Sequence, residues 1–537
     1  MQRSMRFRFC TVLWCLCAAL MIAGCAKSKA GDSAAGLPGA DKSKRVAITV
    51  EVFDRGTDGG RSDPTNNNWT KWIQEKLLKD ENIDVSFVRV SRWDEVVALN
   101  NMMAAGNPPD VALSYSGDLI ANYRDLGGLV DMAPYIDSLM PDLKEFLGPD
   151  PTLPGRDLIR RSQDARTGRI VAIPARRTNV AFQGTFIRKD WLDKLGLPIP
   201  TTREEYYNAL KAFKEKDPGN VGSRNVIPFT MGNAVRYDAG TLLGSFIDPT
   251  ISDKDRWINM VVDRPFLLPG YKEGVRFLNR LYNDGLVDRD FPLPLASHNA
   301  EALIKSGIVG SYIINWDHPY RDSPGILRDL QANVPGAMLV PCDPFVNAEG
   351  KTYKELYDPA GVNFFVPAAS KYPGAAMRYV NWLSREENRL FLQIGPEGIT
   401  HELVDGIPRA KAATGLWIQN SPQNIDYTYT VNGLYLGDEE KTMRGLALSY
   451  NFPPELIISS LEMALKDGKP LPVIPVDLAA AGPYTQTLID KGNVLLAESV
   501  TCSPAAFDKK WDAGIADWIA SGAQVIIDER REKYIAP

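Results

Sequence analysis

The sequence is poor in histidine and cysteine and carries no excess of positive charge. Its 537 residues include three His and six Cys, which leaves little room for a histidine-rich metal site or a disulfide scaffold. Acidic residues (66) outnumber basic ones (61), and this argues against nucleic acid, whose phosphates demand a basic face. After residue 24 no run is long and apolar enough to span a bilayer. We expect no cofactor.

The remaining composition is that of an ordinary globular protein, with 44% hydrophobic and 24% charged residues. At roughly 100–200 residues per domain, the length predicts two or more lobes, each with its own core. Strands are expected at 46–53, 83–90 and 110–115, alternating with helices at 67–79 and 94–105. This alternation predicts a βαβαβ unit with a parallel sheet, and ligands of such sheets sit beyond the carboxyl ends of the strands.

The N-terminus has the pattern of an export signal. Three arginines lie within the first eight residues, and an apolar stretch follows at 11–23, as in signal peptides. The signal ends in Ile22-Ala23-Gly24-Cys25, which resembles the lipobox of bacterial lipoproteins. The resemblance implies removal of residues 1–24 and diacylation of Cys25, with palmitate-type chains anchoring the protein in the membrane. The alternative is a generic signal peptide that happens to precede a cysteine.

Two further features follow from this cleavage. Residues 25–44 are small, polar and aperiodic, and we expect a flexible tether there. Only Cys342 and Cys502 remain besides the lipidated cysteine. They either form one disulfide or stay as two buried thiols, and the sequence favours neither.

The rest of the chain continues the mixture of strands and helices, without internal repeats. Expected strands lie at 182–187, 308–314, 337–341 and 362–367. Expected helices lie at 189–195, 202–216, 271–283, 298–306, 373–384, 454–466, 503–521 and up to 534. The fold class is therefore α/β.

Several segments, taken together, carry a family resemblance. They are EVFDRG (51–56), NNNWTKWIQEKL (66–77), NNMMAAGNPPDVALSY (100–115), IRKDWLDKLGLPIPTTREEYYNALKAFKEKDP (187–218), GLVDRDF (285–291) and AAMRYVNWLSREENRLFLQIGPEGI (375–399). In these segments the chain resembles the extracellular solute-binding proteins of bacterial ABC importers, in the carbohydrate-type group (family 1) that includes LipO-like lipoproteins. Beyond about residue 440 the match is loose.

The resemblance implies a two-lobed, periplasmic-binding-protein-like fold of type II with a ligand cleft between the lobes. The chain is then expected to cross between lobes near 182–187, 358–363 and 408–412. Lobe 1 would comprise 45–181 plus 360–408, and lobe 2 would comprise 182–359 plus 409–537. The implied protein is a lipid-anchored, extracytoplasmic monomer, in a periplasm or at the cell surface, that captures a carbohydrate and delivers it to permease subunits of the importer.

The segment after the strand at 308–314 is the first candidate for ligand contact. Sugar sites combine aromatic platforms with polar partners for the hydroxyl groups, and related carbohydrate binders place a stacking tryptophan here. Trp316 is the expected platform, with Asn315 and His318 as polar partners. The alternatives are core packing for Trp316 and loop structure for the other two.

Two further groups follow strands of the first lobe. Asn68 and Trp69 lie at a helix start, where backbone N–H groups are free for polar ligands. Alternatively, an asparagine in 66–68 caps the helix and Trp69 packs beneath it. Tyr115 and Asp118 follow the third strand, and Asp118 is the better candidate for accepting hydroxyl hydrogen bonds.

Arg176 and Arg177 lie just before the first expected crossing. Two adjacent arginines commonly form a solvated turn. At the edge of a cleft, however, a guanidinium group suits bidentate recognition of a carboxylate. The pair therefore motivates the hypothesis that the ligand is an oligosaccharide containing uronic acid.

One departure from the family concerns calcium. Many relatives carry a calcium loop after the helix that ends here near residue 216. Asp217 is present, but Gly219, Val221 and Val226 supply no side-chain oxygen, and Arg224 adds positive charge. We therefore predict that calcium binding is lost or very weak.

Enzyme motifs are absent from the sequence. It contains no GxSxG elbow, GxGxxG or Walker A loop, and His401-Glu-Leu-Val-Asp405 lacks the second histidine of HExxH. We expect a binding protein, not an enzyme. The alternatives are a secreted carbohydrate-active enzyme and the ligand-binding part of a membrane sensor.

Overall fold

The computed structural model describes residues 36–534 except 57–59, 150–156, 165, 294–295, 323, 348, 353, 473, 475 and 477. The expected signal peptide, Cys25 and most of the expected tether lie outside the described residues. Within them, no helix combines the length and apolarity needed to cross a membrane.

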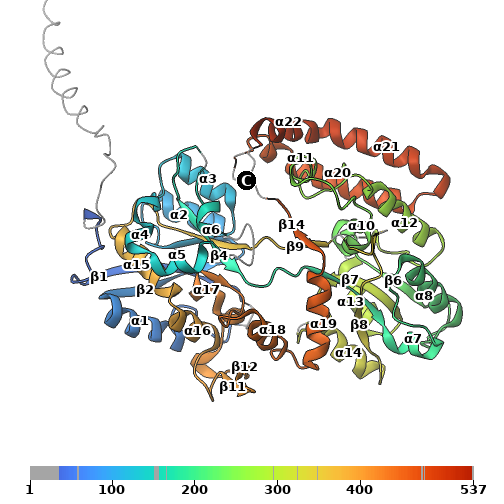
Figure 1. Cartoon of the computed structure of the whole chain (residues 1–537), viewed down its shortest axis with the longest axis horizontal. Coiled ribbons are helices and arrows are strands. Elements are labelled where there is room, and N and C mark those ends of the chain that lie inside the picture. The colour runs from blue at the N-terminus through green and yellow to red at the C-terminus, as the bar shows by residue number, and fades with distance from the viewer. Residues whose placement is uncertain are drawn as a thin grey trace, which may run out of the picture.

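The chain forms two α/β lobes that lie side by side (Figure 1), which confirms the expected fold class. In the first lobe β1 and β2 pair in parallel from Val46↔Ile83 to Asp54↔Ser91, and the bridge Val50↔Val111 extends the sheet toward β3. The strand order is β2-β1-β3-β10-β4-β13. All strands except β10 run in the same direction. The strands are β1 (Val46–Asp54), β2 (Ile83–Ser91), β3 (Ala112–Ser114), β4 (Ala172–Arg177), β10 (Ala360–Phe365) and β13 (Val431–Asn432).

Helices α1 (Asn68–Glu81), α2 (Glu95–Ala104) and α15 (Pro373–Ser384) belong to this lobe. The start of α1 is fixed by Asn67, whose side chain accepts hydrogen bonds from the N–H groups of Trp69 and Thr70. The sequence thus prescribes where the helix begins.

The second lobe contains a four-stranded sheet of order β6-β7-β5-β8. Its strands are β5 (Gln183–Arg188), β6 (Ile227–Thr230), β7 (Val309–Asn315) and β8 (Leu339–Cys342). The main helices around it are α8 (Arg203–Lys216), α12 (Tyr271–Asn283) and α19 (Pro454–Leu465), and the C-terminal helices α20 (Ala481–Thr501), α21 (Phe507–Trp518) and α22 (Gln524–Lys533) complete the lobe. Helix α20 was not expected from the sequence.

Three crossings join the lobes. The first is residues 178–182 between β4 and β5, and the second is residues 357–359 between β9 (Lys354–Leu356) and β10. The third, residues 433–438, lies between β13 and α18 (Glu439–Ala447).

The third crossing lies later in the chain than the sequence suggested. Residues 408–412 do not cross, because β11 (His401–Val404) and β12 (Ile407–Ala410) form a hairpin there. Downstream, Tyr427 and Tyr429 pack in the first lobe's core, and β13 pairs with β4. The part of the chain from 409 to 432 thus belongs with the first lobe, not the second, because these aromatic side chains and this strand are buried there.

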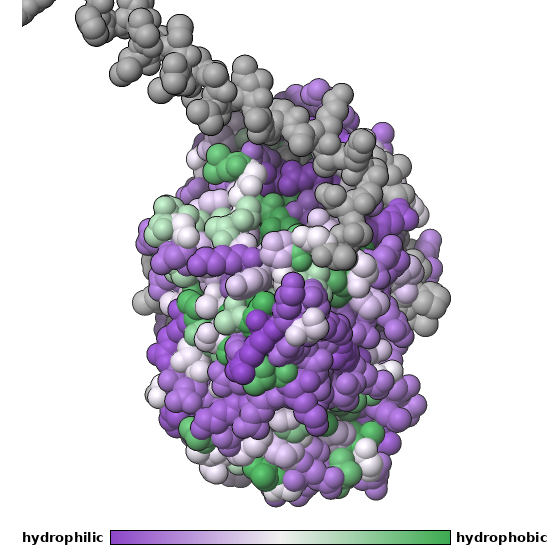
Figure 2. All heavy atoms as spheres, turned by 90° about the vertical axis from the view of Figure 1, so that its left-hand side faces the viewer, coloured by the Kyte–Doolittle hydropathy of each residue, from purple (hydrophilic) through white to green (hydrophobic). Residues whose placement is uncertain are grey.

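The end of the first lobe has a largely hydrophilic surface. Figure 2 shows this end, with apolar residues scattered among polar ones, as is normal for a protein surface. The polar features that bear on function lie instead near the crossings.

Candidate functional site

A cavity of about 650 Å³ lies where the crossings meet the second lobe. It is reached by the carboxyl ends of β4, β13 and β7, the edge at which ligands bind to α/β sheets. The polar and aromatic residues among its lining are Arg177, Thr178, Asn179, Asn315, Trp316, Asp317, Tyr320, Arg321, Asp322, Tyr357, Gln423, Asn432, Thr442, Ser449 and Tyr450. Both lobes and all three crossings contribute to the site.

Trp316 is held firmly in the wall of this cavity. Its backbone N–H donates to the carbonyl of Phe182 at 3.0 Å, and its backbone carbonyl accepts from the Ser460 hydroxyl at 2.6 Å. The indole packs edge-on against Tyr450, with ring centres 6.1 Å apart. Only 5% of Trp316 is exposed, so the side chain is both part of the core and part of the lining.

Hydrogen-bonded polar side chains share the cavity lining with Trp316. The carboxylate of Asp317 accepts from Arg321 Nη2 at 2.5 Å and from the Tyr450 hydroxyl at 2.7 Å. The Asn315 side chain lies near Tyr357, close enough to act against the rise in the pKa of that tyrosine. The contacts of Asp317 hold this carboxylate in a fixed position in the lining of the cavity.

Arg177, at the end of β4, also lines the cavity. Its guanidinium carbon is 4.9 Å from the centre of the Tyr357 ring. Its Nε is buried and has no hydrogen-bond partner among the described residues. Burial raises the pKa of Tyr357, while the positive charges of Arg177 and Arg321 act in the opposite direction. Two guanidinium groups thus face one tyrosine in this cavity.

Arg176 does not share this site with Arg177. Successive residues of a strand point to opposite faces of the sheet, and Arg176 packs beside Phe146, with its Nη2 donating to the Phe146 carbonyl at 2.5 Å. It lines a different depression on the first lobe. The structure therefore does not bring the two arginines together in this cavity.

The residues at the start of α1 are structural in this conformation. Trp69 is fully buried, stands edge-on to Trp417 with ring centres 5.0 Å apart, and donates from Nε1 to the Trp417 carbonyl. Asn67 is the helix cap. Asn68 is half-buried and is not part of the cavity lining.

The other expected residues lie at varying distances from the cavity. The Tyr115 hydroxyl accepts from Arg55 Nη2 and from Asn432 Nδ2, each at 3.4 Å, so Tyr115 lies behind a lining residue. Asp118 is exposed at the start of α3 (Gly117–Asp125) and does not line the cavity. His318 is buried outside the lining, with Nε2 3.1 Å from Glu301 Oε1.

Several cavity residues were not found from the sequence. Asp317 and Arg321 stand four positions apart directly after Trp316, a spacing that could have indicated an ion pair. Tyr357 is the first residue of the second crossing, which the resemblance had placed nearby, at 358–363. Asn432 and Tyr450 carry no local signal, because only the tertiary fold brings them to the site.

No group of three or more His, Cys, Asp or Glu side chains in the described part of the chain is arranged to hold a metal ion. In the loop after α8, Asp217 Oδ1 accepts from the N–H of Val221 at 3.0 Å, and its Oδ2 accepts from the N–H of Gly222 at 2.8 Å. The carboxylate thus binds backbone groups of its own loop.

The two cysteines of the folded body are free thiols, Cys342 buried and Cys502 half-buried. Of the two alternatives that the sequence left open, one disulfide or two thiols, the structure has two thiols.

Comparison with known proteins gives a family match. Residues 63–390 match the model of the family described as "Bacterial extracellular solute-binding protein". The chain is similar to "Lipoprotein LipO" of Bacillus subtilis (23% identical over 541 residues, covering 96% of each chain). It is also similar to "Polygalacturonan/rhamnogalacturonan-binding protein YtcQ" of the same species (26% identical over 295 residues, 55% of this chain). The match to YtcQ spans about half of that relative, 54% of its length.

Solved structures share the fold. One is titled "Crystal structure of alginate-binding protein AlgQ2 without calcium ion" (TM-score 0.57, 20% identity, covering 93% of this chain and 99% of that one). Another is the extracellular solute-binding protein from Bifidobacterium longum subsp. infantis (TM-score 0.64, 18% identity, covering 92% and 98%).

Proposed function

This chain belongs to the bacterial extracellular solute-binding protein family, and on that premise we propose that it captures a carbohydrate and delivers it to the permease of an ABC importer. The observation that carries the proposal is the cavity at the crossings, whose lining combines Trp316 with the hydrogen-bonded Asp317 and other polar side chains. An aromatic face next to carboxylate, amide and guanidinium groups suits a sugar ring and its hydroxyls. YtcQ, a relative, is named for binding polygalacturonan and rhamnogalacturonan.

Delivery depends on closure of the two lobes around the solute. Because residues of both lobes and of the crossings line the cavity, one ligand can contact all of them at once. A ligand favours the closed form only through such differential contacts. The closed pair of lobes is then the form that docks on the permease.

Within this function, the ligand is an oligosaccharide that contains uronic acid. Arg177 supports this choice because its Nε is buried without a partner among the described residues, whereas Arg321 is already paired with Asp317. A carboxylate on the sugar would supply the missing acceptor for Arg177. Arg176, which lines another depression, has no part in this contact.

The protein acts outside the cytoplasm as a lipid-anchored monomer. The support is the lipobox-like Ile22-Ala23-Gly24-Cys25 and the similarity over nearly the full chain to LipO, which is named a lipoprotein. Metabolic labelling with palmitate tests the anchor: label should enter the native chain and be absent from Cys25→Ser. Equal labelling of both would contradict it.

A thermal-shift screen tests the function itself. The purified chain is heated with neutral mono- and oligosaccharides and with uronate-containing oligosaccharides, since any ligand of the native state raises Tm. We expect the largest rise with uronate oligosaccharides and no product release on prolonged incubation. A panel without any shift would contradict carbohydrate binding, and accumulation of shorter products would favour the carbohydrate-active enzyme instead.

A further inference from the structure

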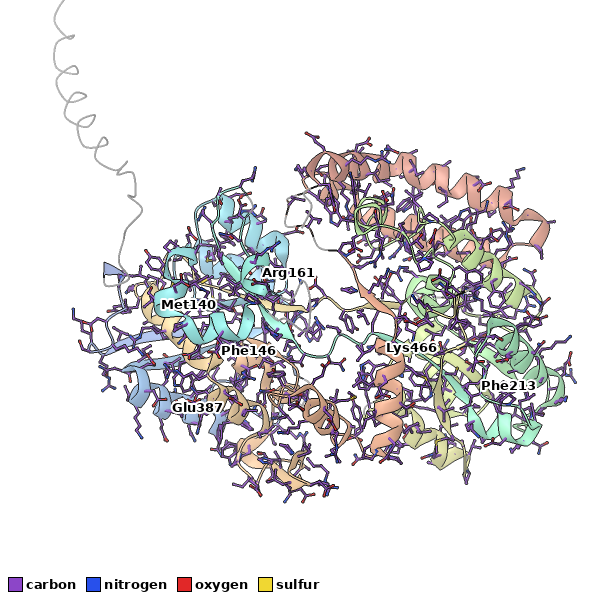
Figure 3. The ribbon with its side chains drawn as sticks, viewed as in Figure 1. Met140, Phe146, Arg161, Phe213, Glu387 and Lys466 are labelled. Atoms are coloured by element: carbon purple, nitrogen blue, oxygen red, sulfur yellow. The ribbon has the colours of Figure 1, made fainter. Side chains whose placement is uncertain are left out.

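A second depression, of about 570 Å³, lies on the first lobe beside the third crossing. It is formed by α5 (Pro141–Leu147), α16 (Glu386–Ile394) and the chain after β13. Phe146 and Glu387, which belong to this region, are labelled on the first lobe in Figure 3. Arg176 lines this depression, and Arg177 lines the cavity at the crossings that we propose for the carbohydrate. Because the two side chains project to opposite faces of β4, the depression and the cavity lie on opposite sides of that strand.

Arg389 is the unusual residue of this depression. Only 6% of it is exposed, and its guanidinium lies 4.1 Å from the ring centre of Phe146 and 5.0 Å from that of Tyr435. Its Nε and Nη1 are buried and have no hydrogen-bond partner in the part of the chain that the structure describes. None of the ion pairs among these residues includes Arg389, whereas nearby Arg385 pairs with Glu81 and Asp142.

A buried cation without an ionic partner is costly, and the unused donors add to the cost. Burial lowers the pKa of Arg389, and the positive charge of Arg176 acts in the same direction. Four carboxylates also line the depression. Asp142 is engaged by Asn381 and Arg385, and Glu145, Glu386 and Glu387 are exposed at the surface. Glu386 acts on Arg389 only through space, and its effect does not reverse the lowering.

We propose that this depression binds a small oxyanion, a phosphate or a carboxylate, through Arg389. The rings of Phe146 and Tyr435, whose centres lie 5.7 Å apart, both contact the guanidinium, and the anion accepts from the N–H groups that no protein group uses. Nothing in this site depends on the carbohydrate proposal.

The position of the site links it to the hinge. Tyr435 belongs to the third crossing, and Gln393 of α16 holds it by accepting from the Tyr435 N–H at 2.6 Å and donating to its carbonyl at 3.3 Å. An anion on Arg389 therefore binds against the segment that joins the lobes. A bound anion is expected to stabilise one conformation of that segment.

Thermal shift and calorimetry on the purified full chain test the proposal, with sodium phosphate and sodium acetate as probes and sodium chloride at equal ionic strength as the reference. We expect a saturable rise in Tm with phosphate, acetate or both. The probe that binds with the higher affinity shows whether the site prefers a phosphate or a carboxylate. No saturable effect beyond that of chloride would overturn the proposal.

Variants assign the effect to the site. Arg389→Met should lose the response, with affinity at least tenfold weaker, whereas Arg409→Met, at an exposed arginine on the β11–β12 hairpin, should keep it. Arg177→Ala should also keep it, which separates this site from the carbohydrate cavity. An unchanged response in Arg389→Met would overturn the assignment. If that variant does not fold, Arg389→Lys takes its place: weakened anion binding supports the site, and unchanged affinity overturns it.

Discussion

The guanidinium carbon of Arg177 lies 4.9 Å from the centre of the Tyr357 ring. Arg177 ends β4 at the first crossing, and Tyr357 lies in the second, so this cation–π contact joins two of the three connections between the lobes. The contact uses the face of the tyrosine and leaves Arg177 Nε without a partner among the described residues. The arginine is thus positioned by the hinge and still has a donor for a ligand.

Replacing Trp316 separates its two roles. Trp316→Ala should reduce carbohydrate affinity at least tenfold and should also lower the free energy of unfolding by about 3–5 kcal/mol, because the ring is almost fully buried. Trp316→Phe should keep most of the stability and lose part of the affinity. Trp93→Ala is the control, since Trp93 is 73% exposed and does not line the cavity. Undiminished affinity in folded Trp316→Ala would remove the indole from the site.

Asp238, at the end of α9 (Val235–Asp238), should make stability depend on pH in an unusual direction. Burial raises its pKa from 3.8 to about 6, and its Oδ2 has no partner among the described residues. Between these values the folded protein keeps the proton and the unfolded chain has lost it. The contribution of Asp238 to the free energy of unfolding is therefore present at pH 4 and declines as pH rises to 6. The slope is about 1.4 kcal/mol per pH unit, so the total loss is about 3 kcal/mol.

Urea unfolding of the native chain and of Asp238→Asn at pH 4 and pH 7 measures this effect. The asparagine variant should gain stability relative to the native chain as pH rises. A stability difference that does not change with pH would show that Asp238 has an ordinary pKa.

Calcium should matter little to this protein. The Asp217 carboxylate binds the N–H groups of Val221 and Gly222, and the loop supplies few other side-chain oxygens. We expect the same Tm, within error, in EGTA and in millimolar calcium. A large drop in Tm with EGTA that disappears in Asp217→Ala would show that a calcium site persists there.

The two thiols should differ in reactivity. Cys342 is 3% exposed, and burial raises its pKa well above the ordinary range, so it should not react with a thiol reagent while the protein is folded. The half-buried Cys502 should react slowly, and both should react at once in denaturant. Labelling of Cys342 in folded Cys502→Ser would show that β8 opens under native conditions.

The elements that the sequence predicted best are those with local periodicity and clear ends. The strands β1 and β2 and the helices α12 and α15 lie within about a residue of their expected positions. Helix α20 was not predicted, and its sequence contains Pro483 and Gly492, two residues that disfavour a helix interior. Pro483 instead lies in the first turn, where no N–H is needed. Gly492 faces Phe266, whose ring would lie 3.1 Å from an added Cβ, so the glycine permits close packing.

The candidate site was less predictable than the fold. Trp316, Asn315 and Arg177 line the cavity. Asn315 and Trp316 follow the strand that the pattern located at 308–314, whereas Arg177 ends β4, a strand that the sequence did not predict. His318 and Trp69 are buried outside the cavity lining, beside Glu301 and Trp417 respectively, and the sequence alone did not decide between ligand contact and packing for either residue. Successive side chains of a strand point to opposite faces. If the extent of β4 had been recognised from the sequence, this alternation would have predicted that Arg176 and Arg177 lie on different faces.

Calorimetric titration of a uronate oligosaccharide and its neutral analogue tests the central claim most directly, using the native chain, Arg177→Ala and the exposed-arginine control Arg328→Ala. A charged hydrogen bond contributes about 1.5–3 kcal/mol, so Arg177→Ala should weaken uronate binding roughly 10- to 100-fold. Neutral binding and the Arg328→Ala control should hardly change. Equal affinity for the two sugars, or full uronate affinity in Arg177→Ala, would contradict the account.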